Sequence, residues 1–240
     1  MFHQVLTLIH KHKEKYKSDV PLLLTLTVPN VNQEELPYML DSMSHAFKKM
    51  MKRRCVLRSI HSWFRSLEIT YNEERDDYHP HFHVLLMVPK DYFDKRYNLF
   101  IHRDEWLAMW QESTGIKDIT QVDVRKIRKR NKKDSIEIVS AEVSKYATKP
   151  SNYIKRTQDK AYVASKKVVE NLHKALKNKR LIGFGGLFVK IRRELKMQDI
   201  EEADLVKITD EEQVCSCSIC QSALVEEMFK WHIGLRNYVG

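Results

Sequence analysis

The sequence predicts an α+β fold, because runs that favour β-strands alternate with segments that favour helices. Residues 21–28 (PLLLTLTV) form a β-favouring apolar run closed by Pro29-Asn30, which predicts a central strand. Residues 82–88 are apolar apart from one histidine, which predicts a mostly buried strand. Between these runs, Asn32 can cap a helix whose apolar residues continue through residues 38–50.

A hairpin and a tryptophan-bearing helix follow from the same kind of pattern. Residues 63–71 alternate in polarity and predict a strand, and a charged loop joins it to the run at 82–88 as an antiparallel pair. Residues 101–114 predict a helix with Trp106 and Trp110 on one face. Such a pair is more typical of a packed core than of a base-stacking platform.

Further helix and strand patterns occur before residue 19 and after residue 119. Residues 1–18 predict a short helix, and residues 120–127 alternate as another strand. Residues 134–147 and 161–176 each predict an amphipathic helix. Glycines cluster at residues 183–186, but the phosphate-binding pattern GxxxxGK[ST] is absent from the sequence, which argues against an ATP loop.

Composition narrows the function to a basic protein with a polyanionic partner. The chain has 240 residues, a mass of 28.6 kDa and 42% hydrophobic residues, enough for one large domain or one domain with an appendage. Its net charge of +10 favours nucleic acid over membrane, since no segment approaches the ~20 apolar residues of a membrane helix. We find no signal peptide, and three of four cysteines crowd between residues 215 and 220, so a cytoplasmic protein is expected.

Metal-ligating side chains gather at the hairpin. Alternation along a strand sends His81 and His83 to one face, where they form a candidate metal pair. The alternative is two solvated polar residues at a strand end. If the hairpin pairs as expected, Glu68 faces both histidines and completes a set of three ligands. This set suits Mg²⁺ or Mn²⁺ as the working cation, although Zn²⁺ or Ni²⁺ could bind more tightly. His79 lies two residues before His81, so the same alternation places it on the face of His81 and His83, where it is a competing ligand.

A polar stripe on the helix at 134–147 suggests a nucleophile. Glu142, Tyr146 and Lys149 stand at i, i+4 and i+7, which is poor core material. An exposed polar face is the alternative. The phenol of Tyr146 would need nearby positive charge, which Lys149 and a bound metal could supply, and Glu142 is placed to accept a proton.

A basic segment adjoins this helix and predicts a phosphate-contacting loop, with a solvated turn as the alternative. Its residues are Arg125, Lys126, Arg128, Lys129, Arg130, Lys132 and Lys133.

Two motifs together resemble the HUH endonuclease superfamily. His81-Phe82-His83 is similar to its histidine–hydrophobe–histidine signature, and Tyr146-Ala147-Thr148-Lys149 is similar to its YxxK nucleophile motif. Four segments in order (PLLLTLTVPNV, HPHFHVLLMVPKDYF, ITQVDVRKI and AEVSKYATK) closely resemble replication initiators of small rolling-circle plasmids in Gram-positive bacteria. The similarity runs from about residue 20 to the C-terminus.

This resemblance implies a central antiparallel sheet of about five strands flanked by helices, with a helical C-terminal extension. Residues 1–155 would be the nicking and joining domain, and residues 156–240 a mostly helical region that packs on it or stands apart. The resemblance also implies that Tyr146 nicks one strand of origin DNA and forms a 5′-phosphotyrosine bond, with Glu142 activating water at termination. The implied partners are single-stranded and origin DNA, a host helicase and a host polymerase, and a homodimer is a further option.

The cysteines mark a departure from the family. Its members often begin with a cysteine-containing segment, whereas this chain has no cysteine before Cys55, so a truncated chain and a short natural variant are both open. Cys215, Cys217 and Cys220 form a candidate structural zinc site, with reduced thiols as the alternative. Three other functions also stay open: a single-strand transposase, a non-catalytic DNA-binding repressor, and a zinc hydrolase.

Overall fold

The computed structural model describes residues 2–127, 154–156, 162–197, 230–232 and 237–239. The chain divides into two compact units, Met1–Ala203 and Asp204–Gly240. The described part of the second unit is an antiparallel pair, β8 (Lys230–His232) with β9 (Asn237–Val239). The predicted metal ligands Glu68, His81 and His83 lie in the first unit.

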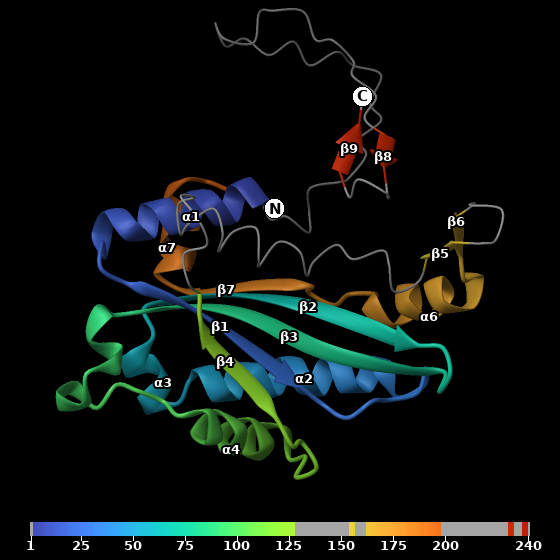
Figure 1. The fold of residues 1–240 in the computed structure, drawn as a ribbon, viewed down its shortest axis with the longest axis horizontal. Coiled ribbons are helices and arrows are strands. Elements are labelled where there is room, and N and C mark those ends of the chain that lie inside the picture. The colour runs from blue at the N-terminus through green and yellow to red at the C-terminus, as the bar shows by residue number, and fades with distance from the viewer. Residues whose placement is uncertain (1, 128–153, 157–161, 198–229, 233–236, 240) are drawn as a thin grey trace, which may run out of the picture. The chain divides into compact units, whose positions relative to one another are not determined.

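A five-stranded antiparallel sheet forms the centre of the first unit (Figure 1). Its order is β4-β1-β3-β2-β7, and each neighbouring pair is antiparallel. The strands are β1 (Val20–Thr27), β2 (Ser62–Asn72), β3 (Asp77–Val88), β4 (Val122–Lys126) and β7 (Ile182–Gly186). The α+β class and the sheet of about five strands are therefore confirmed.

Helices cover both faces of the sheet (Figure 1). One layer holds α2 (Leu36–Met51), α3 (Arg54–Ser59) and α4 (Arg103–Thr114), with α6 (Lys166–Leu176) packed against α2. The other layer holds α1 (Phe2–Lys15) and α7 (Leu187–Glu194). Short 3₁₀ turns η1 (Lys90–Phe93) and η2 (Lys95–Tyr97) follow β3, and β5 (Ile154–Arg156) pairs with β6 (Tyr162–Ala164).

The alternation of side chains along β3 divides the core into two parts. Phe82, Val84 and Leu86 pack towards the α2 and α4 layer, whereas Leu85 and Met87 pack towards α1 and α7. Trp106 and Trp110 are fully buried, which confirms their predicted core role. The indole N–H of Trp110 also donates to the carbonyl oxygen of Thr27, 2.7 Å away, and so joins α4 to β1.

Two segments differ from their sequence prediction. The helix expected at residues 161–176 begins at Lys166, because residues 162–164 are strand β6. The glycine-rich stretch at 182–186, for which no strand is expected, is the edge strand β7. A Cβ at Gly185 would lie 2.0 Å from the indole of Trp63, so glycine lets β7 approach β2 beneath that ring. The helix predicted at 134–147 lies outside the described residues.

Gly186 offers a direct test of how β7 ends. Its φ is +63°, and an added Cβ would lie 2.1 Å from the carbonyl oxygen of His61. Gly186→Ala should therefore lower the free energy of unfolding by about 3 kcal/mol or more, since strain and a backbone clash add. Gly115→Ala is the matched control: its φ is +75° but no atom lies within 4 Å, so it should cost about 1–2 kcal/mol. Urea denaturation compares the two, and equal losses would show that the clash is absent.

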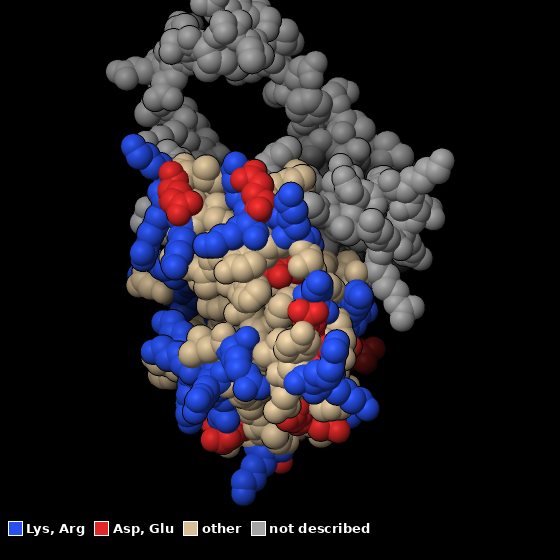
Figure 2. Space-filling view, turned by 90° about the vertical axis from the view of Figure 1, so that its left-hand side faces the viewer, with Lys and Arg blue, Asp and Glu red and all other residues tan. Residues whose placement is uncertain are grey.

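The surface reflects the basic composition. On the end of the molecule shown in Figure 2, Lys and Arg side chains surround an area of neutral residues, with acidic side chains between them. Within the described residues, no helix combines the length and apolarity needed to cross a bilayer.

Candidate metal centre

The pairing of β2 with β3 brings three predicted ligands together. Glu68 lies directly opposite His81, and the next position of the same parity, Ser66, lies opposite His83. Because side chains alternate across a strand, Glu68, His81 and His83 share the sheet face that α1 and α7 cover further along. The hairpin register thus places the carboxylate beside both imidazoles, as the sequence predicts.

The three side chains converge on one point. The Nε2 atoms of His83 and His81 lie 2.9 Å and 3.2 Å from the same carboxylate oxygen, Oε2 of Glu68. The ligand atoms of all three lie within 4.8 Å of one another, and the imidazole rings meet edge to face. All three residues are at most 9% exposed. Two imidazoles and a carboxylate at this spacing fit a divalent cation with coordination positions left for other ligands.

Hydrogen bonds at the far ring nitrogens orient both imidazoles. His81 Nδ1 lies 3.1 Å from the carbonyl oxygen of His79, an acceptor that requires a proton on Nδ1. His83 Nδ1 lies 3.3 Å from the hydroxyl of Thr25 on β1. When Nδ1 carries the proton, Nε2 has a free lone pair, which is the form that binds metal. Thr25 is a positioning residue that sequence reasoning did not single out, because its contact depends on the β1–β3 register.

His79 does not join the cluster. Its Nδ1 lies 2.8 Å from Oδ1 of Asn30, so the ring is held by the loop after β1. The pKa of His79 is lowered, first because burial disfavours the charged imidazolium and then because His81 lies nearby. Of the three histidines at this end of β3, His81 and His83 therefore converge with Glu68, and their role as metal ligands stays a prediction.

The opposite face of β3 is anchored in the core. Phe82 packs edge to face against Phe47, and the guanidinium of Arg65 lies 4.3 Å from the centre of the Phe82 ring. Arg65 is 7% exposed and donates to the carbonyl oxygen of Arg180. These contacts fix the strand segment that carries His81 and His83.

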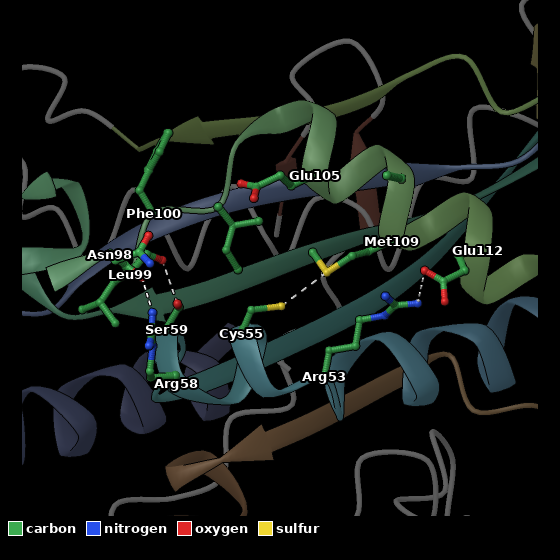
Figure 3. Close-up of a pocket in the computed structure, with 12 residues that line it drawn as sticks. Arg53, Cys55, Arg58, Ser59, Asn98, Leu99, Phe100, Glu105, Met109 and Glu112 are labelled. Carbon is green, nitrogen blue, oxygen red and sulfur yellow. Dashed lines mark hydrogen bonds and ion pairs between the residues drawn. The ribbon is translucent and has the colours of Figure 1, made fainter.

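A surface cavity in the other helical layer is a weaker candidate for a site. It has a volume of about 420 Å³ and lies between α3, α4 and the loop before α4 (Figure 3). Polar groups on its walls already pair with one another: Arg53 with Glu112 at 2.9 Å, and the Ser59 hydroxyl with the Leu99 carbonyl at 2.7 Å. The cavity therefore offers few free polar groups, and it lies on the sheet face away from the histidine pair.

Several predicted site residues lie outside the described residues. They are Glu142, Tyr146 and Lys149 of the nucleophile stripe, Arg128, Lys129, Arg130, Lys132 and Lys133 of the basic segment, and Cys215, Cys217 and Cys220. Arg125 and Lys126 are described, and both are exposed on the edge strand β4. Arg125 pairs with Asp123 at 3.3 Å, and the ammonium of Lys126 lies 5.5 Å from the centre of the Phe93 ring.

Comparison with known proteins finds a matching family model and several similar proteins, all of them described as replication proteins or as "Protein rep". A family model described as "Replication protein" matches residues 1–239. A "Protein rep" of Bacillus amyloliquefaciens is 36% identical over 230 residues, which cover 91% of this chain and 65% of the relative. A "Protein rep" of Staphylococcus aureus is 44% identical over 150 residues, or 62% of each chain. A third, from Streptococcus pneumoniae, is 35% identical over 190 residues, covering 79% of this chain and 56% of the relative.

The chain thus spans 56–65% of the length of these curated relatives. No solved structure matches it.

Proposed function

Because this chain belongs to the replication protein family, we propose that it initiates rolling-circle replication of a plasmid by nicking one DNA strand. The observation that carries the proposal is the convergence of Glu68, His81 and His83 on one point. DNA binding alone does not require two imidazoles and a carboxylate that converge at the end of the central hairpin. A DNA nickase needs such a set beside the scissile phosphate.

The ligand set fits the proposed cofactor. His81 and His83 would offer their Nε2 atoms, and Glu68 a carboxylate oxygen, to Mg²⁺ or Mn²⁺. When bound, the cation would supply positive charge that polarises a phosphate oxygen. The hydrogen bonds that His81 Nδ1 donates to the His79 carbonyl and that His83 Nδ1 makes with the Thr25 hydroxyl keep both imidazoles oriented before the DNA arrives.

Cleavage in this proposal is a transesterification by Tyr146. The phenol oxygen attacks the scissile phosphorus and forms a phosphotyrosine bond to the 5′ end, while the bond to the 3′ oxygen breaks. The phenol proton passes to Glu142, and the leaving oxygen gains a proton to become the free 3′-OH. Lys149 supplies positive charge that favours the phenolate. At termination Glu142 activates a water, which hydrolyses the ester.

The proposal also accounts for a missing motif. The phosphotyrosine ester conserves the energy of the broken DNA bond, so rejoining needs no ATP, and the sequence has no ATP-binding loop. Strand separation and synthesis would then fall to a host helicase and a host polymerase. We further propose residues 1–155 as the nicking domain and residues 156–240 as a second region, of which strand β7 pairs with β2. A cytoplasmic location and a homodimer are further proposals.

The basic segment would gather DNA through its phosphates. Arg125→Ala,Lys126→Ala should weaken binding to single-stranded DNA and lower the slope of log K against log salt by about 1.4, since each lost phosphate contact removes about 0.7. Fluorescence anisotropy over a salt series measures this slope. Lys48→Ala,Lys49→Ala, at two exposed positions of α2, is the control and should leave the slope unchanged. An unchanged slope in the first variant would remove Arg125 and Lys126 from the interface.

A plasmid nicking assay tests the proposal against its rivals. Supercoiled plasmid that carries the cognate origin should relax in the presence of Mn²⁺, and the same plasmid without the origin should not. A DNA-binding repressor would retard both plasmids without relaxing either. A single-strand transposase would instead cut at the terminal hairpins of an element, and a zinc hydrolase would leave no protein on the DNA.

A further inference from the structure

A second cluster of metal-ligating side chains lies on the α1 and α7 side of the sheet, at the other end of β2. His12 comes from α1, Asp19 directly precedes β1, and His61 directly precedes β2. Ser62 and Glu68 are six positions apart along β2, which separates the two clusters by about 20 Å. The proposed nicking reaction uses none of these residues.

The cluster has the same donors and the same convergence as the candidate nicking site. His12 Nε2 and His61 Nδ1 each lie 2.7 Å from the same oxygen, Oδ2 of Asp19. The three ligand atoms lie within 4.8 Å of one another. His12 is fully buried and Asp19 is 3% exposed, whereas the His61 side chain is 31% exposed and opens the cluster to solvent.

Surrounding groups hold the two rings in place. The Ser62 hydroxyl lies 2.9 Å from His12 Nδ1, which leaves Nε2 to face Asp19. Tyr16 stacks on the His61 ring with centroids 4.4 Å apart, and Phe188 packs against the edge of His12. The ammonium of Lys13 donates to the backbone carbonyl of Asp19, and burial lowers the Lys13 pKa. The ligand geometry is therefore fixed by contacts that do not involve a metal.

We propose that His12, Asp19 and His61 bind a second divalent metal ion of the zinc class, distinct from the nicking-site cation. Two imidazoles and one carboxylate bind Zn²⁺ or Co²⁺ more tightly than Mg²⁺ at either cluster, and here the exposed side of His61 leaves the fourth tetrahedral position to water. The ion would fasten α1 to the starts of β1 and β2. A buried carboxylate that accepts hydrogen bonds from two neutral imidazoles is the metal-free alternative.

Cobalt binding distinguishes these two possibilities. The background protein carries His81→Ala, His83→Ala, Cys215→Ser, Cys217→Ser and Cys220→Ser, so that the other candidate sites are removed. Titrated with Co²⁺, it should bind one equivalent with the visible spectrum of a tetrahedral ion, and Zn²⁺ should displace the Co²⁺. Added Zn²⁺ should also raise its thermal unfolding temperature.

Two variants of this background complete the test. His61→Gln keeps an N–H donor for Asp19 and should stay folded, yet its Co²⁺ affinity should fall at least tenfold. His10→Ala, on an exposed position of the same helix, should bind as the background does. The proposal is overturned if the background binds no Co²⁺, or if His61→Gln binds it with unchanged affinity.

Discussion

Tyr146→Phe should abolish origin cleavage, with the rate falling by roughly 10⁴-fold or more, as for other enzymes that lose their nucleophile. The substitution removes one oxygen atom and keeps the aromatic ring. Affinity for single-stranded origin DNA should therefore change less than twofold. Relaxation of supercoiled origin plasmid measures the cleavage, and anisotropy measures the binding.

Tyr38 provides the matched control for this substitution. It is 78% exposed on α2, in the helical layer across the sheet from Glu68, His81 and His83. Tyr38→Phe should cleave at the unaltered rate. Cleavage by Tyr146→Phe at more than a few per cent of the normal rate would assign the nucleophile to another residue.

His81→Ala,His83→Ala should eliminate metal-dependent cleavage, because two of the three proposed ligands are lost and Glu68 alone binds Mn²⁺ weakly. We expect a loss of at least about 10³-fold in rate, comparable to the removal of a major electrostatic group from an active site. Calorimetric titration with Mn²⁺ should show no binding at this centre. Circular dichroism checks that the variant is folded, since both removed imidazoles are buried beside the Glu68 carboxylate.

The structure supplies a control on the same strand. His79 has the parity of the proposed ligands, but its ring is held by Asn30. His79→Ala should therefore keep Mn²⁺ binding and cleave within about threefold of the unaltered rate, which is less than 1 kcal/mol in the barrier. If His79→Ala instead lost activity as completely as the double variant, the proposed ligand set would be wrong.

The sequence predicted those parts of the fold that depend on local pattern. The apolar runs at 21–28 and 82–88 and the alternation at 63–71 and 120–127 correspond to β1, β3, β2 and β4. The fifth strand, β7, was missed because its glycines give no apolar alternation. Its place depends instead on the Trp63 indole, which leaves no room for a Cβ at Gly185. That contact joins residues more than a hundred positions apart, so no local pattern records it.

The candidate metal site, like the fold, could be predicted only where it depends on local pattern. Strand parity was enough to place His81 and His83 on one face, and hairpin pairing was enough to add Glu68. The alternation of side chains along the strand could not exclude His79 from the ligand set, because the direction of the His79 ring depends on a hydrogen bond to Asn30, 49 residues earlier in the chain. Nor could it reveal the cluster around Asp19, whose histidines come from two separate elements and meet only when α1 packs on the sheet.

Mass mapping of a covalent protein–DNA adduct tests the central claim most directly. The chain would be incubated with a single-stranded oligonucleotide spanning the nick region of its cognate origin, in Mn²⁺, then digested and analysed by mass spectrometry. We predict one modified peptide, with the 5′-phosphate of the cleaved strand joined to Tyr146, and no adduct when Mn²⁺ is withheld or when His81 and His83 are both replaced. Cleavage without an adduct, or an adduct on another residue, would contradict the account.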